Sequence, residues 1–269
     1  MADEGQDKNG VLDRIVHFIE KHRKKSWAIL IGLLVTLIIT VGTLGQMASG
    51  AWTMFTQAQS ENDAPASLAL GDAMPSVNDR LGEPRQSMDL CSEIGCKPTE
   101  SNKPVLNIYR HEDYTVRAVF DGNKLEFYAV TRESEKYKPN LKLPFDWGEL
   151  GEFTYTNGIT PDDVDVFHRR FPSYAEVKPL GPPGHDLGTV LGFTPDGYSD
   201  DQSLYLEGLS ALDSALSKEP KERVAAAEGF RAGSKPNTQG VFHDDGGFVG
   251  NLLHSAENAR QIIAMGAER

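Results

Sequence analysis

The sequence lacks an excess of positive charge, and this excludes one large class of function. Its 269 residues include 27 Lys and Arg against 39 Asp and Glu, which gives a formal net charge of −12. Proteins that bind nucleic acids neutralise phosphates with clustered basic side chains, so no nucleic-acid partner is expected. The mean hydropathy of −0.40 also excludes a polytopic membrane protein. Apolar residues make up 39% of the chain, which is enough for a packed core.

Known catalytic motifs are lacking as well. The sequence contains no G-x-S-x-G nucleophile elbow, no G-x-x-x-x-G-K-S/T phosphate loop and no H-E-x-x-H zinc motif. Ser234 stands beside Lys235, but without the S-x-x-K spacing of penicillin-binding enzymes. We therefore expect no catalytic residues and no cofactor.

Two His-Asp pairs are the remaining candidates for chemistry. They lie among glycines, in the segments that hold His185, Asp186, His243 and Asp244. Zinc and calcium bind such ligands, although no motif of fixed spacing is present. Because Asp, Gly and His are also ordinary turn residues, we favour turns here and keep a metal site as the alternative.

One long hydrophobic run stands out at residues 27–47. It contains 21 residues without a charge, and at ~1.5 Å per residue it would cross the ~30 Å hydrocarbon core of a bilayer. Lys and Arg cluster at positions 21–25, and none follows the run until Arg80. The positive-inside rule then predicts an inner-membrane protein with a cytoplasmic N-terminus and a periplasmic or extracellular C-terminal region. Cleavage of this run as a signal peptide, which the small residues 48–51 after it would permit, is the alternative.

A row of small residues recurs every four positions along this run. It consists of Ala28, Gly32, Thr36 and Thr40. Such a row lets two membrane helices approach closely, so it predicts packing against another span or a second copy. The alternative is that these residues are simply common in membrane helices.

The sequence has only two cysteines, Cys91 and Cys96, with four residues between them. A zinc site needs about four ligands, and few candidates lie nearby. The pair therefore predicts a disulfide, which independently favours a location outside the cytoplasm.

The stretch after residue 67 shows regular patterning. Val77 and Leu81 predict a helix over 74–81, which Gly82 ends and Pro84 prevents from continuing. Three strands are expected next, over 105–109, 114–120 and 125–131. Asp121-Gly122 forms the tight turn between the last two strands.

These residues carry a resemblance to a known family. Gly71, Val77, Leu81, Gly82 and Pro84 fit the G-x5-V-x3-L-G-x-P helix of the small-protein-A/BamE lipoproteins, and the hairpin VRAVFDGNKLEFYAV resembles the strands that follow it. The resemblance covers residues 68–131 and implies an extracytoplasmic module that binds proteins. The whole arrangement, with its S-K-P-N-T segment, also resembles a family of uncharacterised bacterial single-pass membrane proteins.

The remaining half of the chain reads mainly as helices and loops. We expect helices over 160–171, 200–217, 220–231 and 251–266, with loops over 179–188 and 233–247. The expected fold is α+β: a single N-terminal transmembrane helix, an extracytoplasmic helix with an antiparallel β-meander, and a mainly helical C-terminal region. The expected segments are 1–26 in the cytoplasm, 27–47 as the span, 48–67 as a tether, 68–131 as the BamE-like module and 132–269 as the C-terminal region.

Together these patterns predict a non-catalytic, membrane-anchored subunit that binds or scaffolds envelope or membrane proteins. A membrane-tethered, metal-dependent envelope hydrolase and an extracytoplasmic sensor are the alternatives.

Overall fold

The computed structural model describes residues 64–97, 103–139, 149–158, 163–167, 173–180, 187–200, 202–215 and 218–266. The chain divides into two compact units, Met1–Gln59 and Ser60–Arg269, and all described residues belong to the second. The expected span at 27–47 and its row of small residues, Ala28, Gly32, Thr36 and Thr40, lie outside the described residues.

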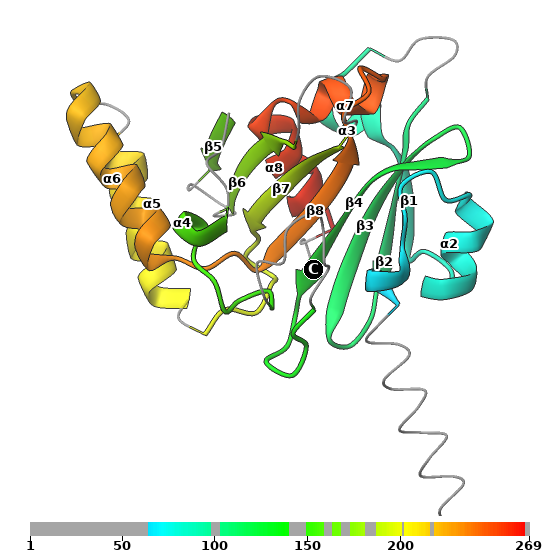
Figure 1. The fold of residues 1–269 in the computed structure, drawn as a ribbon, viewed down its shortest axis with the longest axis horizontal. Coiled ribbons are helices and arrows are strands. Elements are labelled where there is room, and N and C mark those ends of the chain that lie inside the picture. Colours follow the sequence, from blue (N-terminus) through cyan, green and yellow to red (C-terminus); the bar gives the residue numbers. More distant parts are fainter. Residues whose placement is uncertain are drawn as a thin grey trace, which may run out of the picture. The chain divides into compact units, whose positions relative to one another are not determined.

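The second unit is built on one antiparallel sheet of eight strands in the order β1-β2-β3-β4-β8-β7-β6-β5 (Figure 1). Every neighbouring pair of strands is antiparallel. The strands are β1 (Gln86–Asp89), β2 (Val105–Arg110), β3 (Tyr114–Asp121), β4 (Lys124–Arg132), β5 (Asp163–Phe167), β6 (Ser173–Pro179), β7 (Leu187–Phe193) and β8 (Thr238–His243). The first four strands and the last four thus form two halves that meet where β4 pairs with β8.

The helices are short. They are the 3₁₀-helix η1 (Pro65–Ser67) and the α-helices α2 (Met74–Leu81), α3 (Leu90–Ile94), α4 (Tyr155–Gly158), α5 (Gln202–Ala215), α6 (Pro220–Gly233), α7 (Phe248–Leu253) and α8 (Ala256–Ala264). Within the described part of the chain, none of them combines the length and the apolar character that a membrane crossing requires.

The first half follows the sequence patterns closely. Helix α2 has the expected bounds, and Gly82 after it has a φ of +79°, which suits glycine. Strands β2, β3 and β4 lie where alternation predicted them, and Gly122 makes the turn between β3 and β4 with a φ of +61°.

The expected fold class is wrong for the second half, because the C-terminal region supplies four of the eight strands. The expected mainly helical region is therefore a continuation of the sheet, and the expected transmembrane helix is not among the described elements. Strand β5 occupies 163–167, within the helix expected over 160–171, since its Asp-Val-Asp-Val-Phe sequence alternates and pairs with β6. Strand β8 occupies 238–243, in the middle of the loop expected over 233–247.

The sequence does not predict strand β8 because the strand contains a glycine. It includes Gly240, and a Cβ at that position would lie 2.9 Å from both the Phe127 ring and the Tyr128 carbonyl oxygen. A glycine that reads as a turn signal in the sequence is thus required by close packing between β8 and β4. The last expected helix, over 251–266, is in fact two helices, α7 and α8, separated at His254 and Ser255.

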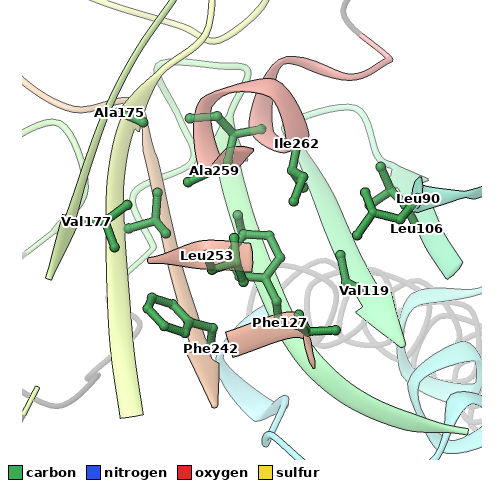
Figure 2. Packing of buried hydrophobic residues seen from close by; sticks show 14 of the residues in the cluster. Leu90, Leu106, Val119, Phe127, Ala175, Val177, Phe242, Leu253, Ala259 and Ile262 are labelled. Atoms are coloured by element: carbon green, nitrogen blue, oxygen red, sulfur yellow. The ribbon is translucent and has the colours of Figure 1, made fainter. Parts of the chain in front are cut away.

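Successive residues of the strands direct apolar side chains to opposite faces of the sheet, and helices cover both faces. Val119, Phe127 and Phe242 face the same side as helices α7 and α8 and share a core cluster with Leu253 and Ile262. Figure 2 shows these side chains gathered between the strands and the two helices. Neighbouring residues of these three strands point to the opposite face and belong to a cluster under α2. A third cluster, which includes residues of β6 and β7, lies under α5 and α6.

Two helical glycines provide a test of how tightly α7 is packed. A Cβ at Gly250 in α7 would lie 2.4 Å from the carbonyl oxygen of His243, whereas nothing lies within 4 Å of a Cβ at Gly229 in α6. We expect G250A to lower the free energy of unfolding by about 1–3 kcal/mol, because the backbone at Gly250 or at His243 must shift to make room for the methyl group. G229A should raise it by about 0.5–1 kcal/mol, since alanine favours the helix. Denaturant titration of both variants checks this, and equal effects would contradict the packing described for α7.

Candidate functional site: an exposed sheet edge and an adjoining hollow

The eight-stranded sheet ends on one side at β1, whose outer edge pairs with no other described strand. Gln86, Ser87 and Asp89 are exposed, and Met88 is half-buried against the core. In an antiparallel pair, alternate residues direct both main-chain polar groups toward the neighbouring strand. The bond from the Leu90 N–H to the Pro104 carbonyl oxygen (3.0 Å) fixes this alternation from Gln86 onward, whereas Arg85, just before β1, also donates its N–H to β2, at the Ile108 carbonyl oxygen (2.8 Å). In the register that follows, Met88 faces β2 and Ser87 directs its N–H and C=O outward.

The end of β1 is anchored firmly. Leu90 follows the strand and is fully buried in the core, while the Asp89 carboxylate accepts a hydrogen bond from the Ser92 N–H (3.1 Å) and caps α3. Cys91 and Cys96 form the predicted disulfide, with a Cα–Cα distance of 4.5 Å, around this short helix. These contacts hold the backbone of β1 in place at its C-terminal end.

A hollow of about 440 Å³ adjoins the start of β1. Its lining residues are Arg85, Gln86, Arg110, His111, Glu112, Glu133 and Gly266. The Arg110 guanidinium donates to the Gly266 carbonyl oxygen, and the Glu133 carboxylate accepts from the Thr115 hydroxyl. The lining of the hollow thus combines basic and acidic groups.

Close to the hollow, Arg117 of β3 is completely buried. Its Nε donates to the Met265 carbonyl oxygen (2.8 Å), its Nη1 to the Thr131 hydroxyl (2.8 Å) and its Nη2 to the Asp196 carboxylate (3.2 Å). Burial lowers the pKa of Arg117, and the negative charge of Asp196 opposes that shift. Arg117 thus connects β3 and β4 to the end of α8 and to the segment after β7. No sequence pattern indicated this role, since an arginine in an alternating strand resembles a solvent-facing residue.

The candidate metal ligands do not converge in the described residues. His243 Nδ1 lies 2.8 Å from the Glu126 carboxylate, while His254 Nε2 contacts Asp244. Among the residues that the structure describes, no three His, Cys, Asp or Glu side chains are grouped so that they could hold a metal ion. His185 and Asp186 lie outside these residues, although Leu187, the next along the chain, pairs with His243.

Ser234 and Lys235 are directed into separate contacts. Ser234 is buried at the end of α6, where its N–H donates to the Phe230 carbonyl oxygen (2.9 Å). The Lys235 ammonium lies 3.8 Å from Asp200 at the surface. The two residues therefore have separate structural roles, Ser234 at the end of α6 and Lys235 at the surface.

A second buried ion pair lies beneath α6, in the other half of the sheet. Arg231 Nε donates to the Glu176 carboxylate (2.5 Å), which also accepts from the Tyr174 hydroxyl (2.6 Å). Burial raises the pKa of Glu176, and the hydrogen bond from Arg231 opposes that shift. This ion pair links α6 to β6. No sequence pattern indicated the contact.

Comparison with known proteins adds no function. No protein-family model matches the chain, and no curated protein sequence matches it significantly. One solved structure, of a proposed β-lactamase inhibitor protein from Streptococcus mutans, is similar over 49% of this chain and 82% of its own. Its sequence identity is 6% and its TM-score is 0.23.

The buried and exposed ion pairs are expected to differ strongly in their contribution to stability. R117M leaves Asp196 without its guanidinium and removes three donated hydrogen bonds, so the free energy of unfolding should fall by about 3–5 kcal/mol. K235M removes an exposed partner of Asp200 and should change it by about 0–1 kcal/mol. Urea denaturation of both variants measures the difference, and a loss below about 1 kcal/mol for R117M would contradict the role given to Arg117.

Proposed function

We propose that this chain is a non-catalytic, extracytoplasmic subunit that binds other protein chains through the outer edge of β1. The observation that carries the proposal is the exposed edge itself. An edge strand with outward N–H and C=O groups is a template on which another extended segment can pair. Anchoring of β1 by Leu90, the Asp89 cap and the disulfide lowers the ordering cost of such pairing.

The location outside the cytoplasm is supported by the disulfide between Cys91 and Cys96, because such bonds persist in oxidising compartments. Attachment to the inner membrane through residues 27–47 stays a prediction from the sequence. The resemblance of residues 68–131 to the small-protein-A/BamE lipoproteins also stays a prediction, and it agrees with a protein-binding role.

The proposal is preferred to a metal-dependent hydrolase because of the contacts of His243 and Asp244. Each is engaged with a different single partner, Glu126 for His243 and His254 for Asp244. Stoichiometric zinc in the purified full-length protein, lost in H243A, would favour the hydrolase instead.

A pair of proline variants in β1 tests the proposal. Proline is tolerated on an edge strand where the missing N–H faces outward, so S87P should keep the fold and lose pairing at the edge. M88P removes an N–H that faces β2 and should lower the free energy of unfolding by about 1 kcal/mol or more. Affinity capture of the full-length protein from mild detergent, followed by mass spectrometry, compares the chains bound by wild type and S87P. We expect them to be lost from S87P at unchanged melting temperature.

The contradicting result is an S87P protein that is stable and captures the same chains in the same amounts as wild type. That outcome would place any protein binding away from β1.

A further inference from the structure

The outward hydrogen-bonding edge of β1 ends beside the hollow. Ser87 directs its N–H and C=O outward, whereas the N–H of Arg85, two residues earlier, donates to the Ile108 carbonyl oxygen of β2 (2.8 Å). A strand that pairs with Ser87 therefore meets no outward N–H at Arg85. Instead it reaches the hollow of about 440 Å³, which Arg85 and Gln86 line. A bound chain that continued past this point would lose its next main-chain hydrogen bond, so the geometry favours a chain that ends here.

We propose that the partner of the β1 edge is the C-terminal segment of another polypeptide, whose last residue is basic and enters the hollow. This inference rests on the proposed function and names the kind of chain that pairs with β1. The segment runs antiparallel to β1, as β2 does on the other side, so its C-terminal end lies at the start of β1. At about 3.3 Å per residue, the next one or two residues after the one paired with Ser87 reach Gln86 and Arg85.

Two guanidinium groups of the hollow suit the terminal carboxylate. The Arg85 side chain is exposed and forms no hydrogen bond or ion pair with another described residue. Arg110 donates to the Gly266 carbonyl oxygen, and its guanidinium carries further N–H donors. A guanidinium binds a carboxylate through two parallel, charge-assisted hydrogen bonds. Because an internal segment has no main-chain carboxylate at this point, these groups distinguish the end of a chain from its interior.

Two carboxylates of the hollow suit a basic terminal side chain. Glu112 is exposed and forms no ion pair within the described part of the chain, while Glu133 is half-buried and accepts from the Thr115 hydroxyl. The net charge of −12 adds a longer-range attraction for a cationic group. A C-terminal Lys or Arg carries both a carboxylate and a cation. It therefore matches a lining that combines arginines with glutamates.

A labelled peptide of sequence TVTVR, and the same peptide with a C-terminal amide, test the recognition of a chain end. The alternating β-branched sequence favours an extended strand, and amidation removes the carboxylate charge. Fluorescence anisotropy with the full-length protein in mild detergent gives the dissociation constants. The amide should bind about tenfold more weakly or worse, because it loses the charge-assisted hydrogen bonds. R85M should bind the acid about tenfold more weakly than wild type does and the amide equally well.

The matched control is K221M, on the exposed surface of α6, which removes one positive charge as R85M does. It should leave both dissociation constants unchanged. R85M keeps the main-chain N–H that donates to Ile108, so its melting temperature should equal that of wild type.

The basic last residue is tested with the peptide TVTVE. It should bind about tenfold more weakly than TVTVR, because its side chain is repelled by Glu112 and Glu133. In the double variant E112Q/E133Q this difference should fall to within about threefold, while the preference for the acid over the amide is kept. Glutamine at position 133 retains an oxygen for the Thr115 hydroxyl. Equal binding of TVTVE and TVTVR to wild type would contradict the role given to the two glutamates.

The results separate this inference from the proposed function. Equal binding of acid and amide, an acid preference kept in R85M, or no binding of TVTVR at about 1 mM would overturn recognition of a chain end. If S87P nevertheless loses its captured proteins, pairing at β1 stands and only the kind of partner is wrong. If TVTVR binds S87P as tightly as wild type, and capture is also unchanged, both proposals fail.

Discussion

The arrangement of the two sheet halves depends on the burial of Arg117. Transfer of a guanidinium from water into the interior costs several kcal/mol unless its donors find partners. Here three structural elements supply them: the end of α8 through Met265, strand β4 through Thr131 and the segment after β7 through Asp196. Helix α8 in turn packs against β5 and β6 at the far side of the sheet. One side chain of the first half therefore fixes a helix that covers the second.

This constraint determines where the sheet can still accept a partner. Six of the eight strands pair on both sides, which leaves β1 and β5 as the outer strands. Strand β5 is held by α8, through the ion pair between Arg260 and Asp165. Strand β1 instead presents exposed side chains and the outward main-chain groups of Ser87. The proposed function follows from this difference between the two edges.

The sequence predicted those elements whose signals are local. Helix α2 and strands β2 to β4 have regular periodicity, and their turns carry glycines at positive φ. The disulfide followed from two cysteines in a short segment. Strand β8 is determined instead by contacts distant in the sequence, because Gly240 is there to fit against Phe127 and Tyr128. The site was hidden for the same reason, since the exposure of β1 depends on which strands pair, and no pattern within residues 85–89 reports that.

The most direct measurement of the central claim is the amide hydrogen exchange of Ser87 in the full-length protein, resolved to the single residue. The N–H of Ser87 faces outward in the isolated chain, so it should exchange rapidly at low protein concentration. Pairing at the edge predicts protection of this amide when a bound protein is present, while Met88, already paired with β2, stays protected throughout. Exchange at Ser87 that is fast under every condition, in a protein that demonstrably associates, would contradict binding through β1.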